Sequence, residues 1–199
     1  MRKVLPHKFY TRNDVHAIAR ELLGKVLVTH IGEQTTSGII VETEAYCPDD
    51  RASHAYQRKL TRRNSVMFRE GGIAYVFMNY GIHYLFNVVT NLENEPDAVL
   101  IRALQPLEGI EVMMKRRDKP DPTRITSGPG ALSKALGIDL NQNGLNLSGE
   151  IVRIEEDDSL NLGGFKIVSS RRIGVDYAGE HARLPWRYYI KNNLWISKP

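Results

Sequence analysis

Two carboxylates lie two residues apart in the segment IIVETEAY, residues 39–46. The β-branched residues of this segment predict a strand, in which alternate side chains point to the same side. Glu42, Glu44 and Tyr46 would then share one face. Carboxylates beside an aromatic ring can activate water or stabilise a developing cation, as hydrolysis of a glycosidic bond requires. A strand with one solvated face would show the same pattern, so the residues alone leave both interpretations open.

A run of positive charge follows this segment. Residues 51–70 hold six basic residues and one acid, Glu70, although the whole chain carries a net charge of only +4. Clustered positive charge suits contact with a phosphate backbone, and a solvated loop could carry the same run. The acidic cluster at 155–158 is expected to lie away from any polyanion. The basic residues of the run are Arg51, Arg58, Lys59, Arg62, Arg63 and Arg69.

A β-hairpin is predicted next, because the strand-forming segments IAYVFM and IHYLFNVV flank the turn Asn79–Tyr80–Gly81. Tyr80 falls at its tip, where a side chain is difficult to bury. The ring could wedge between stacked bases, or it could fold back against its own hairpin.

Metal and cofactor motifs are missing from the sequence. Cys47 is the single cysteine, no HExxH motif occurs, and the remaining histidines lack ligand spacing. His54 lies in the polar segment DDRASHAY, where a surface histidine is the ordinary interpretation. The segment SGPG at 127–130 lacks the lysine of a phosphate-binding loop. We therefore expect neither a metal nor a nucleotide cofactor.

The elements that must position these residues are predicted to form one mixed α+β domain spanning 1–199, because no linker separates two units. Asn13 is the expected cap of a first helix, and a second helix is expected to begin at or near Pro106. A loop is expected over 118–130. Short helical and strand-like segments complete the pattern: strands at 25–30, 39–46, 98–104, 149–157 and 165–175, and a helix at 131–137.

Targeting and membrane segments are not expected. No apolar stretch follows the basic start of the chain, and no run approaches the 18 apolar residues of a membrane-spanning helix. The single cysteine fits a reducing compartment. We expect a cytoplasmic protein, of prokaryotic type.

Several longer motifs occur in one order along the chain: FYTRNDVHAIARELLGKVLV, VETEAY, RRNSVMF, YVFMNYGIHYLFNVV, LIRALQPLEG, SGPGALSKALGI and RRIGVDYAGEHARLPWRYYI. This order resembles the alkyladenine (3-methyladenine) DNA glycosylase family from about Phe9 to Ile196. The likeness covers nearly the whole chain, and the ordered set is far more specific than any one motif.

The resemblance implies a fold and an activity. The fold would be a single domain with a curved, mainly antiparallel sheet, flanking helices and a protruding DNA-intercalating hairpin. The enzyme would flip alkylated or deaminated purines (3-methyladenine, 7-methylguanine, ethenoadenine, hypoxanthine) out of duplex DNA. It would then hydrolyse the N-glycosidic bond and leave an abasic site. No metal, membrane or lyase activity is implied, and we expect a monomer.

The resemblance also implies roles for individual residues. Glu44 would activate the attacking water, which Arg102 and the backbone carbonyl of Val175 would help to hold. Tyr46 and His54 would stack on the two faces of the flipped base.

Further roles concern the pocket edge and the DNA. Asn87 would meet the exocyclic edge of the purine, and Tyr80, aided by Ile82, would fill the gap in the stack. Phe77 stands where the family often has a pocket tyrosine, and the Tyr46–His54 spacing is one residue shorter than in the mammalian pattern. Backbone contacts are assigned to Arg58, Lys59, Arg62, Arg63 and Lys134.

Three questions stay open at this point. The resemblance gives catalysis to Glu44 alone, so the role of Glu42 is undecided. A non-catalytic module that binds damaged DNA would share the basic run and Tyr80. A small-molecule nucleoside hydrolase would use the carboxylate pair and would need neither the run nor the hairpin.

Overall fold

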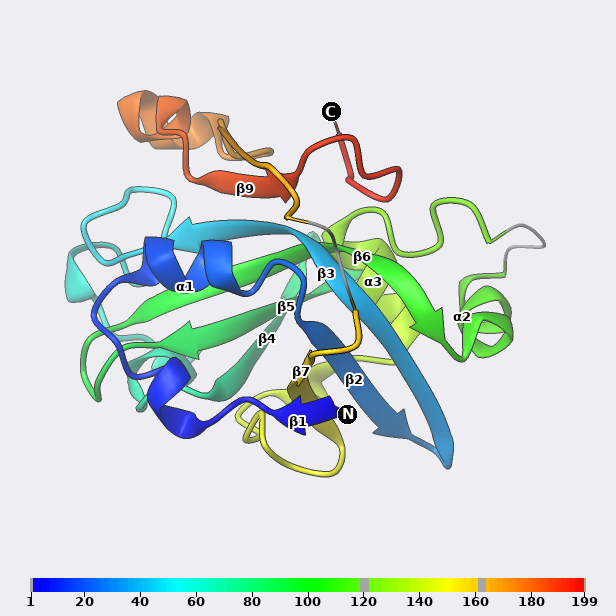
Figure 1. Cartoon of the computed structure of the whole chain (residues 1–199). Helices are drawn as coiled ribbons and strands as arrows, with labels where there is room; N and C mark the ends of the chain where they lie inside the picture. The colour runs from blue at the N-terminus through cyan, green and yellow to red at the C-terminus, as the bar shows by residue number, and fades with distance from the viewer. Residues whose placement is uncertain (1, 119–121, 161–163, 199) are drawn as a thin grey trace.

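The computed structural model describes residues 2–118, 122–160 and 164–198. Nine strands of this described part form one sheet, and every pairing within it is antiparallel. The strands are β1 (Arg2–Val4), β2 (Val26–Ile31), β3 (Gln34–Tyr46), β4 (Ile73–Asn79), β5 (His83–Thr90), β6 (Asp97–Glu108), β7 (Val152–Asp157), β8 (Ile167–Ser170) and β9 (Arg187–Ile190). Their main path runs β1-β7-β2-β3-β6-β5-β4 (Figure 1).

Three α-helices and five short 3₁₀ segments surround the sheet in the described ranges. Helix α1 packs against β3, β6 and β9, whereas α3 packs against β5, β6 and α2. None of the described helices is long and apolar enough to cross a membrane. The elements are α1 (Val15–Glu21), α2 (Ile110–Arg117), α3 (Pro129–Leu136), η1 (His7–Phe9), η2 (Tyr56–Arg58), η3 (Ser65–Phe68), η4 (Leu140–Gln142) and η5 (Asp176–Arg183).

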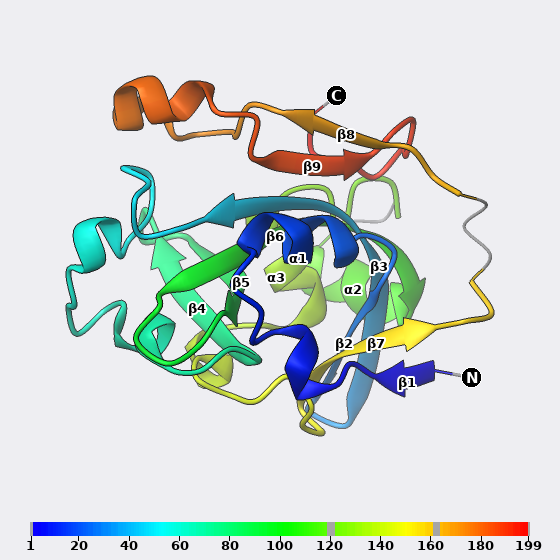
Figure 2. The ribbon, with the colours of Figure 1, turned by 60° about the vertical axis from the view of Figure 1, so that its left-hand side comes forward.

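Strand β3 organises the sheet because it has three partners. It pairs with β2 and then with β9 along one edge, and with β6 along the other. Its register against β6 shifts at Ser37/Gly38 and again around Glu42. Such bulges bend a strand and increase its twist, so the sheet curls at this point. Figure 2 shows β8 and β9 side by side above β3, with η5 beyond the start of β9.

The predicted hairpin is confirmed as strands β4 and β5. Asn79 pairs with His83 at the end of the ladder, and Tyr80 lies in the turn that connects the two strands. Tyr80 and Gly81 both have positive φ, at 49° and 69°. This left-handed pair of turn residues is typical of a tight hairpin connection. The fold class expected from the sequence, a mixed domain with a curved antiparallel sheet, is confirmed as well.

The helix expected from about Pro106 is confirmed as α2, but its predicted start is wrong. Strand β6 continues through Pro106 to Glu108, and α2 begins at Ile110. Pro106 lies opposite Gly38 at an irregular point of the ladder, where a missing N–H is tolerated. Gly109 ends the strand with φ 71°, and a side chain there would come within 2.4 Å of the Thr35 carbonyl oxygen. Pairing with β3 thus overrides the local preference for a helix start.

Two further boundaries differ from expectation. Asp14, not Asn13, caps α1, because its side chain accepts a hydrogen bond from the Ala17 N–H at 2.8 Å. Helix α3 begins at Pro129, inside the predicted loop 118–130, of which residues 119–121 lie outside the described part. The strand expected over 165–175 is β8 alone, and the irregular chain after it reaches the site described next.

Candidate active site

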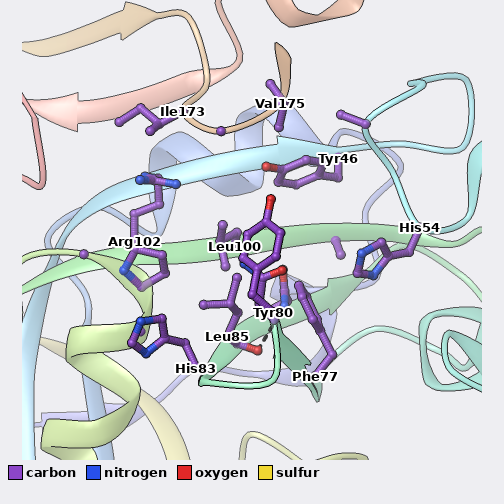
Figure 3. A pocket seen from close by; sticks show the side chains of 18 of the residues that line it. Tyr46, His54, Phe77, Tyr80, His83, Leu85, Leu100, Arg102, Ile173 and Val175 are labelled. Carbon is purple, nitrogen blue, oxygen red and sulfur yellow. Dashed lines mark hydrogen bonds between the residues drawn. The ribbon is translucent and has the colours of Figure 1, made fainter. Parts of the chain in front are cut away.

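A cavity of about 500 Å³ opens between the sheet, the N-terminus of α3 and the segment 173–177. The end of β3 contributes Tyr46, the hairpin strands contribute Phe77 and Asn87, and β6 contributes Arg102. Figure 3 shows Tyr46 with Ile173 and Val175 on one side and Phe77 with Leu85 on the other. The cavity is large enough for a purine-sized ligand.

An aromatic wall forms one part of this cavity. His54 Nδ1 lies 2.9 Å from the Tyr75 hydroxyl, and its ring meets Phe77 at 4.5 Å between centroids. Burial, and then the nearby Arg63 guanidinium, lowers the pKa of His54 to about 4. The imidazole is therefore neutral near pH 7. His54 is a half-buried pocket residue, so its interpretation as an ordinary surface histidine is wrong.

Tyr46 faces the cavity and is held from behind. The guanidinium carbon of Arg172 lies 4.7 Å from the centre of its ring, and Arg172 is in turn paired with Asp50 in a fully buried ion pair. The Tyr46 hydroxyl donates to Glu44 Oε2 at 2.7 Å. Burial, followed by the Glu44 carboxylate, raises the pKa of Tyr46 well above its ordinary value, so the hydroxyl keeps its proton.

Glu44 is fully buried, and the interpretation of its face as solvated is wrong. Its Oε1 accepts the Ile173 N–H at 2.8 Å, and its Oε2 lies 3.3 Å from Arg102 Nη1. Glu44 itself does not border the cavity in the described structure, but Tyr46, Arg102 and Ile173, which contact it, all do. The carboxylate therefore lies directly behind the cavity wall. Its two oxygens can accept about four hydrogen bonds, so capacity for a further donor remains.

Arg102 connects the two carboxylates. Its Nη1 approaches Glu44, and its Nε donates to Glu42 Oε1 at 3.2 Å. Burial acts against the charged form, but the Glu44 and Glu42 carboxylates prevail and raise the pKa of Arg102. A permanent positive charge thus lies beside Glu44 at the cavity wall.

Two groups at the cavity edge can accept hydrogen bonds. The Val175 carbonyl already accepts the Ala178 N–H at 2.9 Å, which leaves its second lone pair. Asn87 donates its Nδ2 to the Tyr75 carbonyl at 3.1 Å. Its Oδ1 is the amide atom that remains for a ligand.

The hairpin tip is exposed beside the cavity. Tyr80 borders the cavity (Figure 3). It is 85% exposed, and Ile82 is 74% exposed. With that exposure, Tyr80 does not pack against its own hairpin, so this alternative is wrong. Large apolar side chains so accessible are typical of contact surfaces.

Comparison with known proteins places the chain in a family. The family model described as "Methylpurine-DNA glycosylase (MPG)" matches residues 8–194. The chain belongs to the methylpurine-DNA glycosylase family. A relative from Chlamydia abortus is 46% identical over 194 residues, covering 95% of this chain and 100% of its own length. One from Desulfitobacterium hafniense is 44% identical over 204 residues, with 98% of both chains covered. Both are named "Putative 3-methyladenine DNA glycosylase".

This membership confirms the resemblance drawn from the ordered motifs and assigns the chain to the DNA glycosylases, which hydrolyse N-glycosidic bonds. In the described residues of this glycosylase, no group of three or more His, Cys, Asp or Glu side chains could hold a metal ion. Among the described residues that border the cavity, none is a lysine.

The basic residues assigned to DNA contact have different surroundings in the structure. Arg58 is paired with Glu95 at 2.9 Å and with Asp49 at 3.7 Å. The Arg63 guanidinium lies 5.0 Å from the centre of the Phe77 ring, so it also supports the aromatic wall. The others assigned to the DNA backbone, Lys59, Arg62 and Lys134, are exposed.

The acidic cluster of β7 lies far from the hairpin in the order of the sheet. Strand β7 is next to the edge strand β1, whereas β4 forms the opposite edge. Its acids are partly neutralised there: Arg2 pairs with Asp157, Arg153 with Glu155, and Lys25 with Glu156.

Several cavity residues were missed at the level of sequence. The segment SGPG enters the cavity wall at the start of α3, and Gly130 lies so close to His83 that a side chain would come within 2.8 Å. The sequence could have indicated this helix start, because SGPG places a proline and glycines directly before a helical stretch. Tyr75, Ile173 and Tyr177 carried no such signal, because tertiary contacts alone bring them to the cavity.

Proposed function

We propose that this glycosylase releases alkylated or deaminated purines, with 3-methyladenine among them, from duplex DNA by hydrolysis of the N-glycosidic bond. The family and the names of the relatives support the class of reaction. The observation that carries the mechanism is the buried Glu44 carboxylate, held by two hydrogen bonds and an ion pair with Arg102 directly behind a purine-sized aromatic cavity.

The flipped base would lie in the cavity between Tyr46 and the wall of His54 and Phe77. Stacking on aromatic rings stabilises each base by about 1–3 kcal/mol. A neutral His54 places no positive charge against a cationic base such as 3-methyladenine, which would otherwise be repelled. Asn87 would lie against the exocyclic edge of the purine, where its side chain would clash with the amino group of guanine.

Hydrolysis requires a water molecule at C1′ of the flipped nucleotide. Glu44 would orient this water and take its proton, with the Val175 carbonyl and Arg102 as further contacts. The electron pair of the C1′–N9 bond would leave with the base while the water oxygen bonds to C1′. A buried carboxylate also stabilises the positive charge that develops on the sugar.

DNA would be opened by the hairpin tip. Tyr80, with Ile82 beside it, would occupy the space that the flipped base vacates, which compensates part of the cost of unstacking. The exposed Lys59, Arg62 and Lys134, with Arg58 and Arg63, would contact phosphates. No lysine lines the described cavity, so we expect no covalent Schiff-base intermediate and hence no lyase activity.

The proposal is tested by release of base from duplexes that carry one hypoxanthine, ethenoadenine or 3-methyladenine. The wild-type protein and Glu44→Gln should be compared, with and without a chelator and with borohydride present in a parallel reaction. We expect release by the wild type alone, no effect of the chelator and no trapped covalent complex.

Other outcomes would favour the competing functions. Tight binding of damaged duplex without release by the wild type would indicate a binding module. Release from free nucleosides but not from duplexes would indicate a nucleoside hydrolase.

A further inference from the structure

Glu42, the second carboxylate of β3, is fully buried and accepts four hydrogen bonds. Arg102 Nε donates to it at 3.2 Å and Arg187 Nη1 at 2.8 Å. Ser197 donates both its N–H, at 2.6 Å, and its hydroxyl, at 2.8 Å. Glu42 does not border the described cavity, and of these three partner residues only Arg102 does.

We propose that Glu42 is a positioning residue, which together with Ser197 holds the Arg102 guanidinium in its orientation toward Glu44. The inference rests on the proposed function, because it concerns the arginine that faces the reacting carboxylate. It assigns no contact with substrate to Glu42.

The geometry of Arg102 supports this role. Its Nε is bound by Glu42, and its Nη2 donates to the Ser197 hydroxyl at 3.4 Å. Only Nη1 then faces Glu44, at 3.3 Å from Oε2. A guanidinium fixed at two of its nitrogens has little freedom to rotate away, so its charge is in place before DNA binds.

The balance of charge supports it as well. Two carboxylates, Glu42 and Glu44, share the buried cluster with two guanidinium groups, Arg102 and Arg187. Without the charge of Glu42, both arginines would have Glu44 as their nearest carboxylate in the cluster. Arg102 would then be free to form a closer pair with Glu44 and to occupy the lone pairs that the water requires.

Segment 195–198 links this cluster to the cavity wall. Ser197 contacts Glu42, and the Trp195 carbonyl accepts the Ser127 hydroxyl at 2.9 Å, beside the start of α3. Arg187 adds a bond from Nη1 to the Lys198 carbonyl at 2.8 Å. One short segment therefore supports both the arginine and the cavity wall.

The test is a double-mutant cycle between Glu42 and Arg102. Single-turnover base release, affinity for damaged duplex and melting temperature should be measured for Glu42→Gln, Arg102→Met and the double variant. We expect Glu42→Gln to slow release by about tenfold or more while affinity stays within about twofold. The double variant should release base at the rate of Arg102→Met, because Glu42 acts through Arg102.

Two further variants make the result independent of folding. Ser197→Ala keeps the carboxylate and removes one hydroxyl, and we expect release to slow by about threefold with the melting temperature little changed. Glu155→Gln removes another buried carboxylate, paired with Arg153 on β7, and should leave the rate unchanged.

Distinct results would overturn the inference. Wild-type rates for folded Glu42→Gln or Ser197→Ala would refute it, as would equal slowing by Glu42→Gln with and without Arg102. Should Glu42→Gln not fold, Ser197→Ala decides alone. An inactive wild-type protein would refute the proposed function instead.

Discussion

The buried charge cluster of Glu42, Glu44 and Arg102 and the hairpin tip differ in how far they are exposed to solvent and in how firmly they are held. Glu42, Glu44 and Arg102 are buried and held by several partners each, whereas Tyr80 and Ile82 at the tip are 85% and 74% exposed. Groups that act on a bond must be in place before the substrate arrives, because reorganisation at that moment costs rate. Groups that enter DNA acquire their contacts only in the complex.

The two regions also differ in the free-energy cost of folding them. Charges buried away from water are unfavourable unless each is paired and hydrogen-bonded. The cluster meets this condition through β3, β6 and β9 and through segment 195–198. The tip needs no such framework, since water solvates its exposed side chains. Substitutions in the cluster should therefore affect chemistry, and substitutions at the tip should affect binding alone.

The largest expected effect comes from Glu44→Gln. In the proposed mechanism, loss of the carboxylate would remove both the acceptor of the water proton and the charge opposite the developing cation. We expect base release to fall by about a thousandfold, or about 4 kcal/mol, while duplex affinity is retained. Single-turnover release and binding to damaged duplex measure the two effects. Glu155→Gln is the matched control, and a rate for Glu44→Gln near that of wild type would end the assignment.

The cavity wall extends the comparison, because His54 is neutral and buried before any base arrives. Its pKa of about 4 lies below the ordinary 6.5, so between these values the unfolded chain binds a proton that the folded chain does not. Stability should thus fall as the pH drops from 6.5 to 4, by up to about 3 kcal/mol from this residue. The slope of the free energy of unfolding against pH, measured with urea at pH 7 and at pH 5, should therefore be smaller in His54→Gln than in the wild type.

Two features isolate the contribution of His54. Burial is the main cause of its low pKa, so Tyr75→Phe, which removes only the hydroxyl partner, should keep most of the slope. Burial raises the pKa of Asp97 to about 6, so this residue makes the protein more stable as the pH falls. Its contribution is the same in the wild type and in His54→Gln and does not affect the comparison. An unchanged slope in His54→Gln would contradict the prediction.

At the tip, Tyr80→Ala should weaken binding of damaged duplex by about 10- to 100-fold, the equivalent of one stacking contact. The melting temperature should stay the same, because the ring is exposed. Ile151→Ala, an exposed apolar residue next to β7, serves as the control and should alter neither quantity. If Tyr80→Ala destabilised the fold as strongly as a cluster variant, the comparison itself would fail.

The smallest effect concerns the basic run. Arg62 is exposed, whereas Arg58 is paired with Glu95 and Asp49. Arg62→Ala should weaken binding of damaged and undamaged duplex alike and reduce the slope of log affinity against log salt by about one. We expect a smaller change for Arg58→Ala, because its carboxylate partners already oppose its charge. If the slope of log affinity against log salt were equal for wild type and Arg62→Ala, Arg62 would not contact DNA phosphates.

Much of the fold followed from local patterns. Alternation in IIVETEAY placed Glu42 and Glu44 on a strand, and strand formers around Asn79–Tyr80–Gly81 predicted the hairpin. The helix start expected at Pro106 is wrong, because strand β6, paired with β3, extends past the proline and the helix begins at Ile110. A local rule describes what a segment prefers alone, and pairing with a distant strand can outweigh that preference.

The sequence by itself determined the family, through the order of its motifs, and it identified the residue types at the site. Alternation along β3 did not distinguish its two carboxylates, which lie two positions apart, and only the resemblance to the family gave catalysis to Glu44. Tertiary structure alone showed how the surroundings of the two carboxylates differ. Glu44 contacts Tyr46, Arg102 and Ile173, which all border the cavity, whereas Arg102 is the one hydrogen-bond partner of Glu42 among the described residues that does so; its partners on β9 and in segment 195–198 lie 145 and 155 residues away along the chain. No local spacing encodes contacts of that length, because they arise only when the whole sheet closes around the cluster.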